Sequence, residues 1–116
     1  MAAKSVKKDI YVRNAKVIRV VDGDTAEFNV DLGCDIRINM MCRLEGINAP
    51  EKVTAAGKAS KAWLEIVLPP GTDVTIQTVK DKKEKYGRYL AAVYIPGSVQ
   101  SLNEDMVKQG LAAAYK

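Results

Sequence analysis

The sequence of 116 residues contains no histidine. This absence excludes Ser-His-Asp and Cys-His catalysis, and it excludes every zinc site that uses a histidine ligand. The two cysteines, Cys34 and Cys42, do not have the spacing of a metal site, and the sequence leaves open whether they form a disulfide. Any catalysis must therefore come from carboxylates, Arg, Lys, Tyr, Ser or Thr, or from a metal ion bound through oxygen.

Long apolar runs and aromatic residues are also scarce. No run approaches the ~18 apolar residues of a transmembrane helix, so we expect no contact with a membrane. The basic first ten residues are not followed by the apolar core of a secretory signal, and we therefore expect a cytoplasmic protein. Aromatic residues form only 6% of the chain, which argues against a surface on which successive bases stack.

Positive charge is in modest excess. The formal net charge is +4 and the isoelectric point is near 9.1, which weakly favours a polyanionic partner such as DNA or RNA. The length suits one domain with a single core. We expect residues 1–8 to form a flexible basic tail and residues 9–116 to form a single domain, which is expected to be monomeric.

Alternating apolar and polar residues predict five strands, at 11–21, 25–32, 36–44, 74–79 and 89–95. In the third segment the residues expected to face the core are Ile36, Ile38, Met40, Cys42 and Leu44. This register directs Arg43 away from the core.

The spacing of apolar residues changes to a helical period after Pro50. The predicted buried face of this helix consists of Ala59, Ala62, Trp63, Ile66 and Val67. Thr54 is its expected N-cap, and the sequence "LPPG" ends it. A second helix is predicted from the capping box of Ser101 and Glu104, and we expect Gly110 to end it and Leu111 to pack back against it.

Three strands, a helix, two strands and a helix fit a mainly β (α+β) fold. The predicted architecture is a five-stranded Greek-key OB-fold barrel with a helix after the third strand and a C-terminal helix. A small open sheet with helices is the alternative fold.

Three short stretches at predicted strand ends combine polar residues. In "VVDGDT", Asp22-Gly23 predicts a hairpin turn in which the glycine has a positive φ. The other two are "RLEGINAPE" (43–51) and "KYGR" (85–88), each of which is by itself also typical of a solvated loop. Together they supply carboxylates and two arginines, which suit hydrolysis of a phosphodiester: the arginines bind phosphate oxygens, and a carboxylate accepts the proton of water.

The ordered set "VDGDT", "RLEGINAPE", "KYGRYLA" and "LNEDMVKQGLA" resembles the staphylococcal nuclease-like (thermonuclease) family. The resemblance extends from Lys16 to Tyr115. It implies an OB barrel that hydrolyses phosphodiester bonds of DNA or RNA, usually with calcium, although other divalent cations remain possible.

The resemblance also implies roles for individual residues. The implied metal ligands are Asp24, Asn48, the backbone carbonyl of Ala49, and Glu51 through a water molecule. The implied catalytic residues are Arg43 and Arg88, which contact the phosphate, and Glu51, which activates or positions the water. The implied substrate contacts are Lys85, Tyr86 and Tyr115, and the residues expected to support the metal ligands are Asp22 and Thr25.

The chain departs from the prototype of the family at Asn48, where the prototype has aspartate, and at Ala49, where it has threonine. A metal bound here would have one formal negative charge fewer around it. Two alternatives to a nuclease remain. One is a catalytically weak or inactive nucleic-acid-binding OB module, and the other is a structural barrel with a protein partner. The joint presence of Asp24, Arg43, Glu51 and Arg88 favours the enzyme, because a binding module gains nothing from a carboxylate beside a phosphate.

Overall fold

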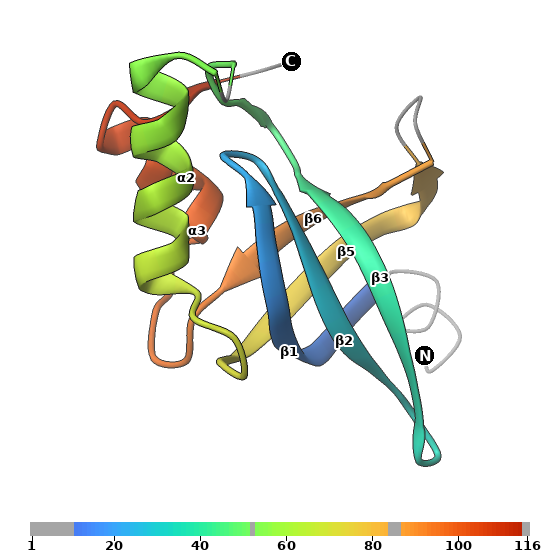
Figure 1. Ribbon diagram of the computed structural model, residues 1–116. Coiled ribbons are helices and arrows are strands. Elements are labelled where there is room, and N and C mark those ends of the chain that lie inside the picture. Colours follow the sequence, from blue (N-terminus) through green and yellow to red (C-terminus); the bar gives the residue numbers. More distant parts are fainter. Residues whose placement is uncertain (1–10, 52, 84–86, 115–116) are drawn as a thin grey trace.

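The computed structural model describes residues 11–51, 53–83 and 87–114. The predicted basic tail at residues 1–8 lies outside this part of the chain. Figure 1 shows a barrel of strands with the described helices on one side of it. The strands are β1 (Tyr11–Asp22), β2 (Thr25–Gly33), β3 (Ile36–Leu44), β4 (Ile47–Asn48), β5 (Asp73–Lys83), β6 (Tyr89–Tyr94) and β7 (Ala113–Ala114), and the helices are α2 (Ala55–Val67) and α3 (Leu102–Lys108).

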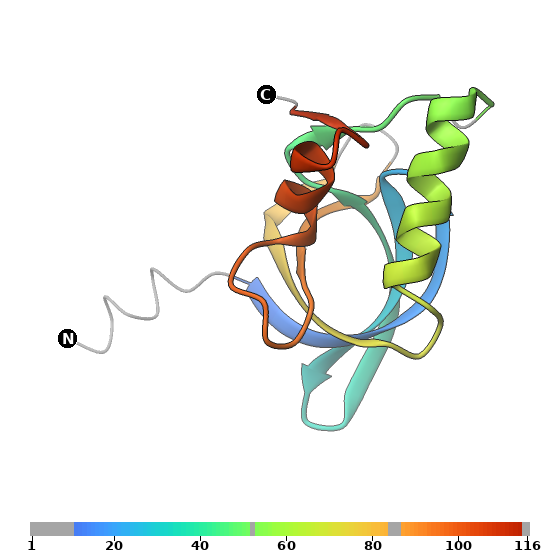
Figure 2. The same cartoon turned by 90° about the vertical axis from the view of Figure 1, so that its left-hand side faces the viewer.

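Five of the strands form a closed barrel in the order β1-β2-β3-β6-β5, which confirms the predicted mainly β barrel (Figure 2). Neighbouring strands run antiparallel except β3 and β6, which pair in parallel over three residues, from Cys42 opposite Tyr89 to Leu44 opposite Ala91. The short strands β4 and β7 pair outside the barrel and were not predicted. None of the helices in the described ranges is long and apolar enough to cross a membrane.

Alternation places one face of each barrel strand in the core. In β2, Ala26, Phe28 and Val30 are at most 1% exposed, and in β3 Cys42 and Leu44 are fully buried. Removing a large apolar side chain of this kind from water stabilises the fold by about 2 kcal/mol. The core therefore fixes the register of β2 and β3, whose ends position the candidate site.

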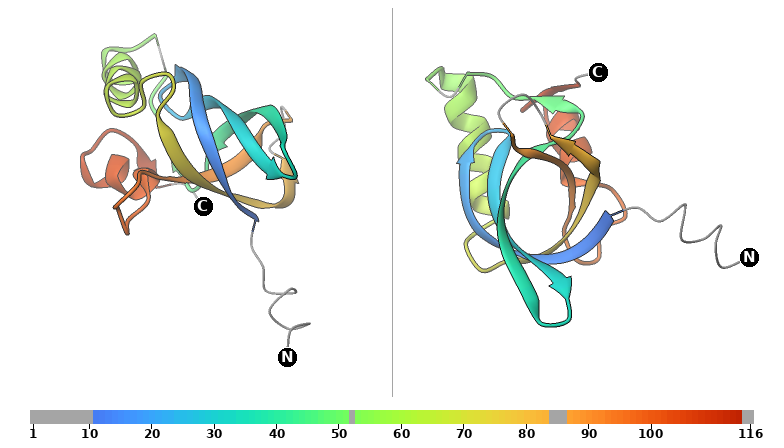
Figure 3. Two further views of the ribbon diagram at one scale, coloured as in Figure 1. Left: turned by 90° about the horizontal axis from the view of Figure 1, so that it is seen from below. Right: turned by 90° about the vertical axis from the view of Figure 1, so that its right-hand side faces the viewer.

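The predicted core face of β3 is wrong at its first half. Ile36 and Ile38 are 54% and 42% exposed, and Leu32 on the opposite strand is 44% exposed. The reason is that the hairpin of β2 and β3 extends beyond the ring of strands (Figures 2 and 3), while β3 meets β6 only from Cys42 onward. Alternation shows which side of a strand is apolar, but it does not show where the barrel ends.

The buried face of α2 also differs from the prediction. Thr54 is the N-cap as expected, because its hydroxyl accepts from the N–H of Gly57 at 3.0 Å. However, the buried residues are Gly57, Ser60 and Leu64, whereas the predicted face is only partly buried at Trp63 and Val67 and is exposed at Ala59, Ala62 and Ile66. The small residues Gly57 and Ser60 let α2 approach the barrel closely. The spacing of apolar residues does not predict this, because neither residue is a large apolar one.

Ser60 is buried without an energetic penalty because its polar atom has partners. Its hydroxyl lies 3.1 Å from the carbonyl oxygen of Ala56 and within hydrogen-bonding distance of the carbonyl oxygen of Leu111. The second contact links α2 to the segment that follows α3. A buried serine hydroxyl thus joins α2 to the residues that follow α3.

The ends of α3 confirm the sequence signals. Ser101 and Glu104 form the capping box, with the N–H of Glu104 donating to the Ser101 hydroxyl at 3.2 Å. At the other end Gly110 has a φ of 75°, and the N–H of Leu111 donates to the carbonyl of Met106 at 2.9 Å, as in a Schellman motif.

Asn103 on α3 is a buried polar residue that connects the helix to the barrel. Its amide N–H₂ donates to the carbonyl oxygens of Glu45 and Ala91 at 2.7 and 3.1 Å, and its oxygen accepts from the N–H of Val93 at 3.1 Å. The side chain thereby satisfies backbone groups where β3 and β6 meet. Asn103 is 4% exposed, so a backbone group that lost its hydrogen bond to this side chain would have no water to replace it.

Replacing Asn103 by aspartate tests this connection. The shape is retained, but the two carbonyl oxygens lose their donor and face a buried carboxylate, so we expect the free energy of unfolding to fall by about 3 kcal/mol. Denaturant unfolding measures the change. The matched control is Asn14→Asp on an exposed position of β1, which should change stability by less than about 0.5 kcal/mol. Equal effects of the two substitutions would contradict the structural role of Asn103.

Candidate active site

The turn between β1 and β2 is packed tightly against the rest of the protein. Gly23 lies in this turn and is buried, but it is not among the glycines with positive φ, so the predicted reason for the glycine is wrong. A Cβ atom at this position would lie 2.9 Å from the Cβ of Ala49 and 3.0 Å from the Cβ of Ser60. Glycine is required here by close contact, which brings the turn against the loop after β4 and against α2.

Asp24 follows Gly23 and receives hydrogen bonds from two directions. Its Oδ1 accepts from the hydroxyl of Thr25 at 3.1 Å, and its Oδ2 accepts from the N–H of Ala49 at 3.2 Å. Its own N–H donates to Oδ1 of Asp22 at 3.2 Å. Burial raises the pKa of Asp24, and the neighbouring Asp22 carboxyl raises it further, while the Ala49 N–H and Arg43 oppose the shift. The turn therefore holds a carboxylate whose negative charge is incompletely compensated.

Two arginines connect to this carboxylate, one directly and one through the hydroxyl of Thr25. Nη2 of Arg43 lies 3.6 Å from Oδ2 of Asp24 and donates to Oδ1 of Asn48 at 3.1 Å. Nη1 of Arg88 donates to the hydroxyl of Thr25 at 3.1 Å. Because β3 and β6 pair in parallel from Cys42 opposite Tyr89, Arg88, which directly precedes β6, lies beside the last residues of β3. As predicted, the Arg43 side chain points out of the core.

The contacts unite most of the predicted site residues. The joined residues are Asp22, Asp24, Thr25, Arg43, Asn48, Ala49 and Arg88. Among the described residues, no hydrogen bond or ion pair connects Glu51 to this group; Glu51 is exposed, and its carbonyl accepts from the N–H and hydroxyl of Thr54. The predicted substrate contacts Lys85, Tyr86 and Tyr115 lie outside the described residues.

The oxygen donors beside the turn suit a hard divalent cation. Two carboxylates, Asp22 and Asp24, are adjacent, and the amide oxygen of Asn48 shares the Arg43 guanidinium with Asp24. In the described ranges, no group of three or more His, Cys, Asp or Glu residues is arranged around a common point. A cation here would therefore complete its shell with amide or carbonyl oxygens and water, which calcium accepts.

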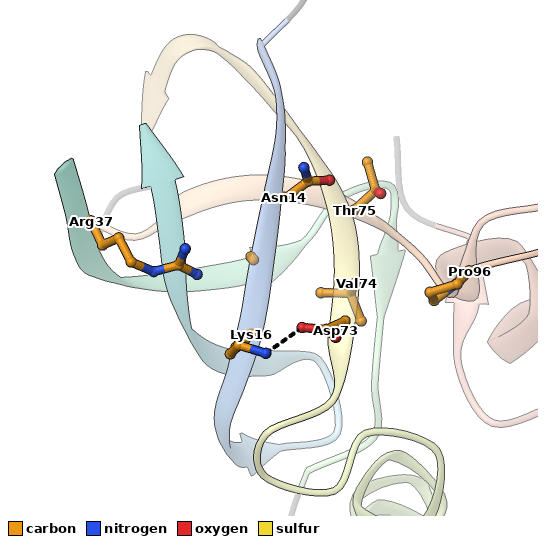
Figure 4. A pocket seen from close by; sticks show the side chains of 8 residues that line it. Asn14, Lys16, Arg37, Asp73, Val74, Thr75 and Pro96 are labelled. Atoms are coloured by element: carbon orange, nitrogen blue, oxygen red, sulfur yellow. Dashed lines mark hydrogen bonds and ion pairs between the residues drawn. The ribbon is translucent and has the colours of Figure 1, made fainter. Parts of the chain in front are cut away.

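A separate pocket lies on the outer face of β1 and β5 (Figure 4), and it contains none of the predicted site residues. Its cations are already neutralised. Lys16 pairs with Asp73 at 2.6 Å, and Arg37 lies 3.7 Å from Asp31. Each cation of this pocket thus lies beside an aspartate.

Comparison with known proteins identifies the family of the chain. The model of the family described as staphylococcal nuclease homologue matches residues 41–116, which include Arg43, Glu51 and Arg88. The chain belongs to the staphylococcal nuclease family. Relatives of this nuclease homologue include an uncharacterized endonuclease of Haemophilus influenzae, 36% identical over 87% of the chain, and one of Escherichia coli O157:H7, 34% identical over 89%. A thermonuclease of Staphylococcus intermedius is 32% identical over 96% of the chain. The chain spans 52%, 61% and 65% of these three relatives, respectively.

The close packing of the β1–β2 turn can be tested by substitution of Gly23. Gly23→Ala places a Cβ within 3.0 Å of two others, so we expect the free energy of unfolding to fall by about 2 kcal/mol. Because one of the two contacts is with Ala49, the loss should be smaller when Gly23→Ala is made in an Ala49→Gly background. Chemical denaturation of all four proteins measures the coupling. A Gly23→Ala protein as stable as its parent would show that the turn does not pack as described.

The charge of Asp24 gives a second test. The pKa of Asp24 is raised in the folded protein, so the ionised form of this side chain opposes folding. Asp24 therefore lowers the free energy of unfolding at a pH above its folded pKa, and this stability returns as the pH falls through that pKa. Asp24→Asn removes the charge and keeps an oxygen for the Ala49 N–H. In excess chelator at pH 7, we therefore expect the free energy of unfolding of the variant to be about 1 kcal/mol higher than that of the parent. The gain should disappear in acid, where Asp24 is protonated in both states. Equal or lower stability of the variant at pH 7 would contradict the assignment.

Proposed function

We propose that this protein is a divalent-metal-dependent endonuclease that hydrolyses phosphodiester bonds of DNA or RNA. The observation that supports this function most strongly is the connection of Asp24 to two arginines. Arg43 reaches it at 3.6 Å, and Arg88 reaches it through the hydroxyl of Thr25. A carboxylate that binds a cation next to two guanidinium groups is suited to hold a phosphate that gains negative charge during attack.

The residues of the chain have distinct roles in this proposal. Arg43 and Arg88 bind the non-bridging oxygens of the phosphate, and their planar groups offer paired donors to them. Water attacks phosphorus on the side opposite the leaving oxygen, and the carboxylate of Glu51 accepts the proton of the water or positions it. Lys85, Tyr86 and Tyr115 contact the rest of the substrate. Glu51 is one residue beyond Pro50, in a loop whose backbone is tied to the first turn of α2 through Thr54.

The cation proposed for these oxygen donors is calcium, which would be held by Asp24, Asn48, the carbonyl of Ala49 and, through water, Glu51. When bound, it supplies positive charge beside the phosphate and increases the acidity of nearby water. Arg43 contacts both Asp24 and Asn48. Because this guanidinium contacts two of the proposed ligands, Arg43 would lie beside a cation bound there.

Cleavage of labelled single-stranded DNA, RNA and plasmid DNA tests the proposal. We expect cleavage with calcium and none in excess chelator. Arg88→Lys keeps the charge but removes the paired donors, so turnover should fall by about 10²-fold, with weaker effects on substrate affinity. The matched control is Arg19→Lys, because Arg19 pairs with Glu27 on the outer face of the barrel. This variant should cleave at the rate of the parent.

Two results would contradict the proposal. The first is undiminished cleavage in chelator by a stringently purified sample, and the second is equal turnover of the Arg88→Lys and Arg19→Lys variants. Binding of oligonucleotides without cleavage under any metal would instead identify a nucleic-acid-binding OB module.

A further inference from the structure

Thr25 connects the aspartate of the site to one of its arginines. Its hydroxyl donates to Oδ1 of Asp24 and accepts from Nη1 of Arg88, both at 3.1 Å, and the residue is 1% exposed. We propose that Thr25 is a positioning residue that sets the orientation of the Arg88 guanidinium relative to Asp24. The proposal rests on the nuclease function given above, and it adds a residue that touches neither the metal nor the phosphate.

The direction of the two hydrogen bonds follows from chemistry. An ionised carboxylate only accepts hydrogen bonds, and a hydroxyl has a single proton, so Asp24 takes that proton. The lone pairs of the Thr25 oxygen remain, and a guanidinium, which only donates, is the matching partner. The hydroxyl therefore links a pure acceptor to a pure donor. Neither valine nor alanine at position 25 can make this link.

The position of the hydroxyl is itself well determined. Threonine is branched at Cβ and has restricted side-chain rotation, and burial removes water as a competing partner. Thr25 also lies directly opposite Arg43 in the pairing of β2 with β3. One residue thereby relates both arginines to Asp24: Arg43 through the backbone register, and Arg88 through the hydroxyl.

This arrangement has a consequence for turnover. Loss of the link to Thr25 removes one of the contacts that orient the Arg88 guanidinium, and its donors are then less well aimed at the oxygens that gain charge during attack. The effect should appear in the rate of the chemical step more than in substrate binding, because charge on those oxygens is greatest in the transition state. We expect kcat to fall about tenfold in Thr25→Val, with KM within about twofold of the parent.

The experiment compares Thr25→Val, which keeps the shape, with Thr25→Ser, which keeps the hydroxyl. Thr25→Ser should retain kcat within about threefold of the parent. Thr75→Val, on the outer face of β5, is the matched control and should leave kcat unchanged. In an Arg88→Ala background Thr25→Val should cause no further loss, because its effect acts through Arg88. The same loss in both backgrounds would show that Thr25 does not act through Arg88 and would overturn the proposal. Equal losses in Thr25→Val and Thr25→Ser would assign Thr25 a packing role and would also overturn it.

A second readout does not require activity. In ¹⁵N NMR spectra of the arginine side chains, rotation of the Arg88 guanidinium should be slow in the parent and faster in Thr25→Val. Thr25→Ser and Thr75→Val should behave as the parent. Unchanged rotation in Thr25→Val would overturn the positioning role even if the protein cleaves nucleic acid. Absence of cleavage by the parent, together with faster rotation in Thr25→Val, would reject the nuclease function and leave the positioning of Arg88 established.

Discussion

The short parallel pairing of β3 with β6 is the interaction on which the rest of the structure depends. It spans three residue pairs, and it is the contact that closes the ring of strands. It also places the start of β6 beside the end of β3, so Arg88 and Arg43 approach the same carboxylate. Asn103 satisfies backbone groups next to this pairing and couples it to α3. The closure of the barrel and the assembly of the site are therefore consequences of one contact.

The site is built from short segments that are separated in sequence and meet at one end of the barrel. Asp22 ends β1 and Asp24 lies in the turn that follows, the end of β3 supplies Arg43, and β4 and the residue after it supply Asn48 and Ala49. Helix α2 fixes this loop from the other side, because Thr54 binds the carbonyl of Glu51 and Ser60 packs near Gly23. A partly buried aspartate beside Asp22 opposes folding, as its raised pKa indicates. The surrounding packing has to offset that cost to keep the site in place.

Much of this fold follows from sequence because its signals are local. The caps at Thr54 and Ser101, the glycine at 110 and the alternation along β2 each depend on residues within a few positions of one another. The same holds for the outward direction of Arg43, which alternation alone fixes. The residues that meet at the site were predicted from motifs whose spacing resembles a family. Their mutual contacts, including the bridge through Thr25, were not predicted, because hydrogen bonds across strands depend on side-chain geometry that spacing does not contain.

The errors of prediction share a physical cause. The reason for the glycine at 23, the burial of Ser60 and the exposure of Ile36 all depend on how closely one element approaches another. Apolar periodicity describes only the preference of a single element and contains no information on that distance. An alanine such as Ala59 is apolar but small, so a helix gains little from burying it, and the closer approach allowed by Gly57 and Ser60 decides the orientation of α2. The short strands β4 and β7 have two residues each, too few for any alternation to be recognised.

The extension of the β2–β3 hairpin has a practical consequence for studying the protein. Its tip carries Cys34, which is exposed, whereas Cys42 is buried in the barrel and its pKa is raised to about 12. Because thiolates are the reactive form, alkylating reagents at neutral pH should modify Cys34 and spare Cys42. The tip is separated from Arg43 by the length of β3, about 30 Å for an extended strand. The unmodified sequence thus provides a single attachment point for a fluorophore or a surface tether, at the end of the strand remote from the site.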